Sequence, residues 1–429
     1  MNALAIARGP IRTTVIVPGS KSIANRALTV AALADGESLL VGVPGGDDVT
    51  AMLAGLGALG CETVSEGEGS RGGEVRIVGS GARFAGGARI DTALAGTTSR
   101  FLTAVAALGR EPTLVDGGAP LRRRPMRPLH DALRALGFEI ESRALPGEYL
   151  PVAVARGSAH GGRVSLPGDV SSQFVSALMM IGPVLDEGLT IELSTPLVSL
   201  PYVELTASVM RSFGASDVRI DGSVIEIAPG RYRGTRYEIE PDASSASYPW
   251  AAAALTGGVV EVVGLRADAL QGDIEFLRIV RRMGCRVSEG DRGARVEGPA
   301  RLEAIDVDMT NFSDLVPTVA VMAAVADGRS RIRGVGFIRN KESDRIGDLA
   351  AGLRRLGALV VEHDDGLEIE PVPLSGARLA THHDHRLAMA WSLLALVVDG
   401  VSIDDPGVVS KSWPEWWETR ATLLRSAEG

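Results

Sequence analysis

A polar, turn-rich cluster recurs six times along the chain at nearly constant spacing, and each cluster leads into an apolar run of helical character. The clusters read PGSKS, LAGTT, DVSSQ, DASSAS, NFSDL and HHDHR. Successive separations of 77, 76, 72, 70 and 71 residues lie between the markers Gly19, Gly96, Ser172, Ser244, Asp314 and His385. A long and regular spacing of this kind indicates a repeated supersecondary unit. We therefore predict that the chain consists of six copies of one module.

A glycine recurs in step with the clusters, 40 to 43 residues after each of the first five markers. These glycines end the segments LGALG, LRALG, MRSFG, VRRMG and LRRLG, at Gly60, Gly137, Gly214, Gly284 and Gly357. A glycine just past a helix supplies the left-handed residue that caps it. The apolar runs that follow have the character of strands. Each module is thus expected to contain a helix, strands, a second helix and a strand.

The clusters lie where helix N-caps are expected, because Ser, Thr, Asp and Gly precede the helical runs. The first turn of a helix carries unpaired N–H groups and a partial positive charge, which attract anions. Six such termini directed at one cleft would form an anion-binding site.

The length of 429 residues exceeds the roughly 250 to 300 residues at which a single core stops growing, so two domains of three modules are expected. The turn-rich segment 228–241 is the best boundary candidate. The strand ahead of Pro18 precedes the first cluster, and the last module otherwise runs out of chain, so we expect this strand to pair in the second domain. The predicted domains are residues 1–20 with 241–429, and residues 21–240.

Composition excludes several classes of protein. Forty-four Lys and Arg against 53 Asp and Glu give a formal charge of −9, which argues against a general nucleic-acid surface. The apolar runs are shorter than the ~18 residues of a membrane span, and no leader signal is present, so a cytoplasmic protein is expected. Cys61 and Cys285 each follow a cap glycine, which favours buried packing over a redox or metal role.

Two segments carry cations suited to a small phosphorylated acid. Lys21, Ser22 and Arg26 lie at the start of the first helix, where Ser22 and Arg26 share a face. In the segment DGGAPLRRRPMRPL, an extended backbone would point Arg122 and Arg124 the same way. Arginine forks bind carboxylate and phosphate oxygens in pairs. A capped surface helix and a solvated basic loop are the alternative interpretations.

The segment FIRNKESDRIGDLAAGL places Lys341, Glu342 and Arg345 at the start of a helix with a buried stripe. This pattern indicates either surface ion pairs, worth about 0.3 to 0.5 kcal/mol each, or a proton donor beside anion-binding cations. The histidines of THHDHR suggest a metal site, but the HExxH pattern and a second ligand set are missing from the sequence. No metal is therefore expected.

The ordered motifs PGSKSxxNRAL, AGTxxR, RxRP, SSQF, PY, DASSASY, QGD, KExDR, DHRxAM and K-[ST]-x-P cover essentially the whole chain. Together they resemble the 5-enolpyruvylshikimate-3-phosphate (EPSP) synthase family, which joins phosphoenolpyruvate to shikimate 3-phosphate. The resemblance implies an α/β fold, α+β in some schemes, with two domains of three βαβαββ units and a cleft that closes on substrate. It also implies no cofactor, no metal and a monomer.

The resemblance further assigns roles by position. Shikimate 3-phosphate would contact Lys21, Ser22, Arg26, Ser171, Ser172, Gln173, Ser199, Asp314 and Lys341. Phosphoenolpyruvate would contact Lys21, Gly96, Arg124, Gln173, Arg345, Arg386 and Lys411. Lys21 would also belong to the catalytic residues. Asp314 would accept the proton of the 5-hydroxyl, and Glu342 would protonate the methylene carbon of phosphoenolpyruvate. Addition would give a tetrahedral intermediate, and elimination would release phosphate.

Four positions depart from the family pattern, namely Leu94, Phe101, Leu200 and Phe337. Leu94 stands in place of Asn, Phe101 in place of Pro, and Leu200 in place of Lys. Phe337 stands where an Asn commonly contacts shikimate 3-phosphate. Gly96 is retained, so the resemblance implies room for the inhibitor glyphosate.

Three alternatives were weighed against this hypothesis. The related UDP-N-acetylglucosamine enolpyruvyl transferases usually carry a reactive Cys in a loop of their first domain, a position that neither Cys61 nor Cys285 occupies. RNA 3′-terminal phosphate cyclases use similar modules, but the acidic balance disfavours an RNA partner. An inactive phospho-ligand sensor would have lost the acid or the base, whereas Asp314 and Glu342 are both present.

Overall fold

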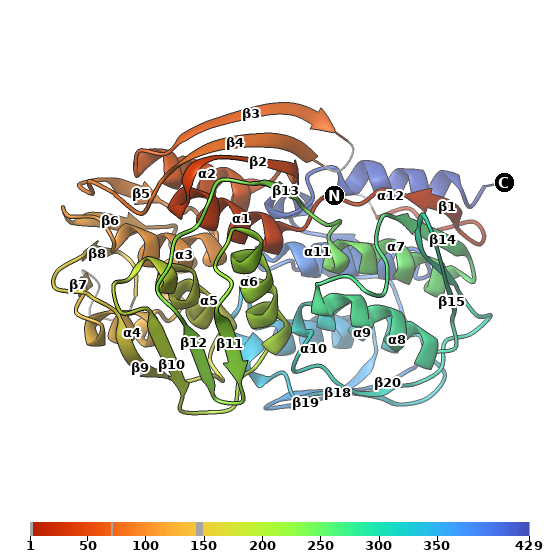
Figure 1. Cartoon of the computed structure of the whole chain (residues 1–429). Coiled ribbons are helices and arrows are strands. Elements are labelled where there is room, and N and C mark those ends of the chain that lie inside the picture. The colour runs from red at the N-terminus through yellow and green to blue at the C-terminus, as the bar shows by residue number, and fades with distance from the viewer. Residues whose placement is uncertain (1–2, 70–71, 143–148, 429) are drawn as a thin grey trace. The chain divides into compact units, whose positions relative to one another are not determined.

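The computed structural model describes residues 3–69, 72–142 and 149–428 (Figure 1). The chain forms two compact units. One, here called the N-terminal unit, comprises Gly19–Ile239, and the other, the C-terminal unit, comprises Met1–Pro18 with Glu240–Gly429. The domain boundaries expected from the sequence, after residues 20 and 240, lie next to these limits.

Three four-stranded sheets form the N-terminal unit. The first has the order β13 (Arg236–Glu238), β2 (Asp35–Val43), β4 (Gly72–Ser80), β3 (Glu62–Gly69), with helices α1 (Lys21–Leu33) and α2 (Asp47–Ala58). The second has the order β5 (Arg89–Asp91), β6 (Thr113–Asp116), β8 (Val152–Ala155), β7 (Glu139–Ser142), with α3 (Gly96–Ala106) and α4 (Arg127–Ala135). The third has the order β9 (Gly162–Leu166), β10 (Leu189–Leu193), β12 (Val224–Ile227), β11 (Val218–Asp221), with α5 (Ser172–Ile181) and α6 (Leu200–Ser212).

The C-terminal unit repeats this pattern. Its first sheet has the order β1 (Arg12–Val15), β14 (Val259–Val263), β16 (Gly293–Glu297), β15 (Arg286–Gly290), with α7 (Ala243–Thr256) and α8 (Phe276–Arg282). Its second has the order β17 (Asp306–Asp308), β18 (Ser330–Arg333), β20 (Gly366–Glu370), β19 (Leu359–His363), with α9 (Val316–Ala323) and α10 (Arg345–Arg355). The last module contains β21 (Arg378–Leu379), β22 (Ser402–Ile403), α11 (His385–Leu394) and α12 (Trp416–Arg425).

Each complete sheet joins one parallel strand pair to an antiparallel hairpin. In the second module, for example, β5 pairs parallel with β6, β6 pairs antiparallel with β8, and β8 pairs antiparallel with β7. A single strand thus lies between the two helices, and two strands follow the second helix. The expectation of several strands between the helices and one after them is wrong, whereas the βαβαββ order is confirmed.

The first strands of modules one and four are exchanged along the chain. Strand β1 precedes α1 in sequence but pairs parallel with β14, where Arg12 lies opposite Val259. Strand β13 precedes α7 but pairs parallel with β2, where Arg236 lies opposite Leu39. The expected pairing of the strand ahead of Pro18 is confirmed. The segment 228–241, the expected domain boundary, contains the limit between the two units at Ile239 and Glu240, and it also contains β13, which completes a sheet.

Local capping follows the sequence markers. The five expected cap glycines all have positive φ, between 91° and 99°, as the left-handed cap requires. The side chains of Ser20, Ser171, Asp242 and Asp384 accept a backbone N–H in the first turn of α1, α5, α7 and α11. Helices α3 and α9 begin without a side-chain cap.

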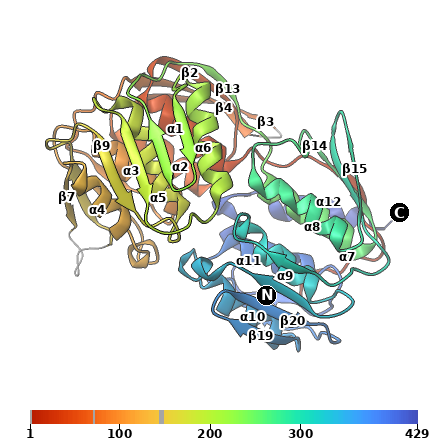
Figure 2. The ribbon, with the colours of Figure 1, turned by 60° about the horizontal axis from the view of Figure 1, so that its bottom comes forward.

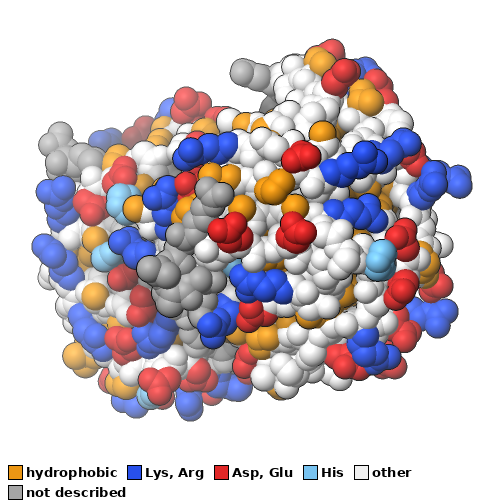
Figure 3. Space-filling view, turned by 90° about the vertical axis from the view of Figure 1, so that its left-hand side faces the viewer, with side chains coloured by type: hydrophobic (Ala, Val, Ile, Leu, Met, Phe, Trp, Pro, Cys, Tyr) orange, Lys and Arg blue, Asp and Glu red, His pale blue; other side chains and the backbone are white. Residues whose placement is uncertain are grey.

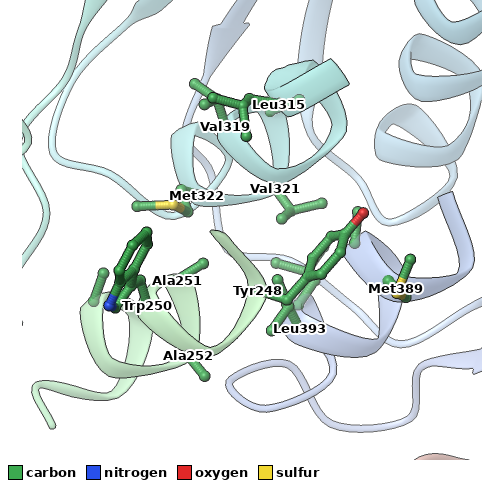
Figure 4. Packing of buried hydrophobic residues seen from close by; sticks show 14 of the residues in the cluster. Tyr248, Trp250, Ala251, Ala252, Leu315, Val319, Val321, Met322, Met389 and Leu393 are labelled. Atoms are coloured by element: carbon green, nitrogen blue, oxygen red, sulfur yellow. The ribbon is translucent and has the colours of Figure 1, made fainter. Parts of the chain in front are cut away.

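The first helices of the modules form the centre of each unit. Helices α1, α3 and α5 contact one another, as do α7, α9 and α11 (Figure 2). In the second group, Tyr248 and Trp250 of α7 belong to one buried apolar cluster with Met322 of α9 and Leu393 of α11 (Figure 4). Because these helices are buried nearly all round, their apolar residues do not form a single stripe. Among the described residues, no helix combines the length and the apolar character of a membrane span.

Helix α4 buries a histidine, His130, whose ring nitrogens have no hydrogen-bond partner among the described residues. Burial, aided by the nearby charge of Arg134, lowers the pKa of His130 to about 4. Between pH 6.5 and 4 the unfolded chain would bind a proton that the folded chain rejects. The free energy of unfolding should therefore fall as the pH is lowered through this window, by up to about 3 kcal/mol.

Urea denaturation of the wild type and of His130→Leu at pH 7, 6 and 5 would measure this contribution. We expect the stability of the wild type relative to the variant to decrease steadily as the pH falls from 6.5. If the free energies of unfolding of the two proteins changed with pH in parallel, the lowered pKa of His130 would be contradicted.

Candidate active site

In the N-terminal unit, the expected residues gather where α1, α3 and α5 begin. Lys21 Nζ lies 2.9 Å from Asp48 Oδ2 at the start of α2. Thr98 Oγ1 donates to the carbonyl oxygen of Asp48 at 2.9 Å, and Gln173 Nε2 donates to Thr97 Oγ1 at 3.1 Å. The first turns of four helices are thereby tied together.

Gly96 is the first residue of α3 and lies against two guanidinium groups. Arg100 Nη1 donates to the Gly96 carbonyl oxygen at 2.6 Å. A Cβ atom at Gly96 would contact the Arg124 guanidinium and would lie 2.6 Å from Arg100 Nη1. Only glycine therefore leaves both arginines in place. Their positive charges add to that of the helix N-terminus, a combination that favours an anion.

The arginine segment does not have the extended backbone assumed from the sequence. Leu121–Arg123 form a turn of 3₁₀-helix. Arg122 binds both carboxylate oxygens of Asp116, at 2.9 and 2.7 Å, while Arg124 lies against Gly96. The predicted extended backbone is therefore wrong, and Arg122 and Arg124 have different partners.

Arg26 is buried inside the N-terminal unit. Its Nε donates to Thr206 Oγ1 at 2.7 Å and its Nη2 to Ser176 Oγ at 3.1 Å. The guanidinium carbon lies 5.4 Å from the ring centroid of Phe101 and 5.6 Å from that of Tyr202. Burial lowers the pKa of Arg26 to about 10, although the Tyr202 charge opposes this shift. In this structure Arg26 braces α1, α3, α5 and α6, and its contact with shikimate 3-phosphate stays a prediction.

The serine positions lie at further helix starts. Ser22 is in the first turn of α1, and Ser171 and Ser172 begin α5. Ser199 precedes α6 with φ 57° and ψ 43° and is 3% exposed. A left-handed serine is strained, and such residues concentrate at functional sites. The side-chain oxygen of Gln173 is buried without a hydrogen-bond partner among the described residues.

In the C-terminal unit, one buried arginine ties three carboxylates together. Arg345, 1% exposed, begins α10. Its Nε donates to Asp384 Oδ2 at 2.7 Å, its Nη1 to Asp314 Oδ1 at 2.8 Å and its Nη2 to Glu342 Oε2 at 3.0 Å. Burial would lower the pKa of Arg345, but these three carboxylates raise it above its usual value.

Two further cations complete this carboxylate cluster. Arg386 Nη2 donates to Asp314 Oδ2 at 2.7 Å, and Lys411 Nζ donates to Glu342 Oε1 at 3.1 Å. Asp314 and Glu342 are each bound by two cations. Burial would raise the pKa of Asp314, but the charges of Arg386, Lys341 and Arg345 hold it well below its usual range. Asp314 is therefore ionised at neutral pH.

The remaining positions have distinct surroundings. Lys341 Nζ lies 5.8 Å from the ring centroid of Phe337, one of the departures from the family pattern, so this ring contacts the cation through its face. His382 and His383 are solvent-accessible with left-handed φ, whereas His385 is buried 3.7 Å from Asp384. Within the part of the chain that the structure describes, no group of three His, Cys, Asp or Glu side chains is arranged to hold a metal ion.

Sequence reasoning gave no role to several residues of the two clusters. Asp48 holds Lys21, Arg100 contacts Gly96, and Asp384 holds Arg345 while its Oδ1 accepts the backbone N–H of Arg386 at 2.9 Å. The sequence signal that could have identified Asp48 and Asp384 is their position at the start of a helix. The expected residues thus form two clusters, one in each unit.

Asp384 is fully buried, and its replacement would remove one of the three carboxylates that match the charge of Arg345. We expect Asp384→Asn to lower the free energy of unfolding by about 3 kcal/mol. Asp306→Asn is the matched control, because it removes the exposed pair in which Asp306 lies 3.1 Å from Arg333, and it should cost less than about 1 kcal/mol. Equal losses for the two variants in urea denaturation would show that the buried network does not carry this stability.

The chain is similar to known proteins over nearly its whole length. The family model described as EPSP synthase (3-phosphoshikimate 1-carboxyvinyltransferase) matches residues 6–419. A 3-phosphoshikimate 1-carboxyvinyltransferase of Trichormus variabilis is 40% identical over 410 residues, covering 95% of both chains. One from Methanosphaerula palustris is 39% identical over 417 residues, covering 96% of this chain and 97% of its own. The solved EPSP synthase of Acinetobacter baumannii superposes with a TM-score of 0.81 at 26% identity, covering 99% of this chain and 97% of that one.

Proposed function

The chain belongs to the EPSP synthase family, and we propose that it transfers the enolpyruvyl group of phosphoenolpyruvate to the 5-hydroxyl of shikimate 3-phosphate. The reaction releases inorganic phosphate and serves the shikimate pathway, which leads to chorismate and aromatic amino acids. One observation of the structure supports this chemistry above the others. The two terminal nitrogens of one buried arginine donate to Asp314 and to Glu342, and each carboxylate also contacts a second cation.

Asp314 is proposed as the base. Asp314 is ionised at neutral pH, so a carboxylate oxygen can accept the proton of the 5-hydroxyl while the hydroxyl oxygen attacks C2 of phosphoenolpyruvate. Arg345 and Arg386 fix both oxygens of this carboxylate. A base held in this way is oriented before the substrate arrives, which lowers the reorganisation needed in the transition state.

Glu342 is proposed as the acid that protonates C3 of phosphoenolpyruvate. Its two oxygens accept hydrogen bonds from Arg345 and Lys411. The carboxylate and phosphate of phosphoenolpyruvate would compete for these same cations. Their binding releases Glu342 from the two donors and allows it to take up a proton. The product of addition is a tetrahedral intermediate, from which C3 loses a proton and phosphate departs.

The N-terminal unit is proposed to bind substrate anions through the cluster around Gly96. Lys21, Gln173 and Arg124 all lie at or beside helix N-termini. Two polyanionic substrates repel one another, so cations must offset this repulsion before a bond can form. Ser22, Ser171, Ser172, Ser199 and Lys341 are proposed as further contacts of shikimate 3-phosphate. A cytoplasmic location and a monomeric state stay predictions.

Two alternative activities receive no support from the structure. Burial raises the pKa of the thiol of Cys61 to about 11 and that of Cys285 to about 12, so neither is a reactive nucleophile at neutral pH. The face of the molecule in Figure 3 carries Lys and Arg side chains interspersed with Asp and Glu. Such mixed charge on a chain of net charge −9 is unlike an RNA-binding surface.

The deciding experiment is phosphate release from phosphoenolpyruvate, with shikimate 3-phosphate or UDP-N-acetylglucosamine as the acceptor. Release should depend on shikimate 3-phosphate alone. Turnover with the nucleotide sugar, or with neither acceptor, would overturn the proposal.

Glu342→Gln tests the role of the acid. It should lower kcat by about a hundredfold or more while changing either KM less than about threefold, because the amide cannot donate a proton to carbon. Glu362→Gln on β19 makes the same change in an exposed ion pair with Arg339. This control variant should leave kcat unchanged. A Glu342→Gln enzyme with normal turnover would exclude this residue as the acid.

Gly96→Ala tests the anion site of α3. The added Cβ would displace the Arg124 guanidinium, so KM for phosphoenolpyruvate should rise about tenfold. Gly57→Ala on α2 is the control, since a Cβ there meets open space. In the wild type, millimolar glyphosate should compete with phosphoenolpyruvate, and Gly96→Ala should weaken this inhibition. Unchanged KM in the variant would show that Arg124 does not bind this substrate.

A further inference from the structure

A third carboxyl, Asp273, is buried behind the carboxylate cluster of the C-terminal unit. It is 3% exposed and lies in a short 3₁₀-helix, Gly272–Glu275, which follows β14 and precedes α8. Its Oδ2 accepts a hydrogen bond from Ser244 Oγ in the first turn of α7. The proposed reaction assigns no role to either residue.

Ser244 connects this carboxyl to Arg386. Arg386 Nη2 lies 3.5 Å from Ser244 Oγ, at the outer limit of a hydrogen bond, and 2.7 Å from Asp314 Oδ2. A hydroxyl has one hydrogen to donate and two lone pairs to accept. When Ser244 donates its hydrogen to Asp273, its lone pairs are available to the guanidinium of Arg386.

We propose that Asp273, acting through the hydroxyl of Ser244, positions the guanidinium of Arg386 for binding the anionic groups of phosphoenolpyruvate. Asp273 is thus a positioning residue, since it touches neither substrate nor reacting atom. The inference rests on the proposed function and adds to it a residue that controls one of its cations. The connected groups come from four segments of one unit, namely Asp273, Ser244, Arg386 and Asp314.

The charge of Asp273 is poised to respond to pH. The groups that face it are Asp242 at the N-cap of α7, Asp314 before α9 and Arg386 on α11, besides Ser244 itself. Burial, followed by the repulsion of Asp314, raises the pKa of Asp273 to about 7, against the attraction of Arg386 and the hydrogen bond from Ser244. Asp273 therefore changes its protonation state near neutral pH.

The two protonation states hold Arg386 differently. The ionised carboxylate can only accept, so Ser244 donates to it and turns its lone pairs toward Arg386. The protonated acid can donate to the Ser244 oxygen, which then accepts from Asp273 as well as from Arg386 and is a weaker acceptor for the guanidinium. The guanidinium of Arg386 is then held less firmly by Ser244 and is less well positioned for a ligand. KM for phosphoenolpyruvate should accordingly rise as the pH falls below about 7.

The test compares wild type with Asp273→Asn, Ser244→Ala and the double variant. Each single variant should raise KM for phosphoenolpyruvate by about fivefold, with kcat and KM for shikimate 3-phosphate within about twofold of wild type. The double variant should be no worse than either single one, because both changes break the same connection. Ser247→Ala is the matched control. Ser247 is a buried serine of the same helix that bonds to the Ser244 carbonyl oxygen and lies 3.3 Å from Thr318 Oγ1.

The pH dependence separates positioning from a merely structural role. Phosphoenolpyruvate also ionises, but its ionisation affects all variants equally. The ratio of KM in Ser244→Ala to KM in wild type therefore reports only the ionisation of the protein. This ratio should approach one below pH 6 and rise above pH 7. A ratio that is constant with pH would overturn the proposal even if Asp273→Asn does not fold. Normal KM values in both single variants would also overturn the proposal, as would a KM increase in the double variant equal to the product of the two single increases. A wild type that releases no phosphate would refute the proposed function instead.

Discussion

The C-terminal unit depends on the ion pairs that the buried guanidinium of Arg345 makes with three carboxylates. An arginine without access to solvent is costly unless its charge is matched, and three carboxylates match it here. These carboxylates come from the start of α9, the turn before α10 and the start of α11. The requirement to satisfy one cation therefore fixes the positions of three segments. The same guanidinium holds Asp314 and Glu342, the proposed base and acid.

The repeated module explains why such groups converge. Each module buries its first helix at the centre of a unit and begins it with a polar cluster, so three clusters meet in each unit. The N-terminal unit uses its three helix starts for Lys21, Gly96 and Gln173. In the C-terminal unit they supply Ser244, Asp314 and Arg386. Repetition thus provides the scaffold, and the residue chosen at each helix start determines the chemistry.

Much of this arrangement could be predicted from the sequence because it rests on local rules. Gly60 and its counterparts follow from the need for positive φ, and Asp384 caps a helix as its position before an apolar run indicates. The pairing of β13 with β2 could not be predicted, because a three-residue strand finds its partner nearly 200 residues away. Arg122 and Arg124 were misjudged for a similar reason, since a short turn of 3₁₀-helix directs them. The packing role of Arg26 could not be predicted either, because its partners Ser176 and Thr206 lie 150 and 180 residues further along the chain.

The exchange of first strands has a consequence for the gene as well as for the fold. Because β1 belongs to the unit encoded after residue 239, and β13 to the unit encoded before it, no contiguous stretch of coding sequence specifies the whole C-terminal unit. A single cut after residue 239 would leave the N-terminal unit with its three sheets, but it would separate β1 from β14 and so remove a strand from the C-terminal unit. The N-terminal segment that carries β1 must therefore be present for the C-terminal unit to form all of its sheets.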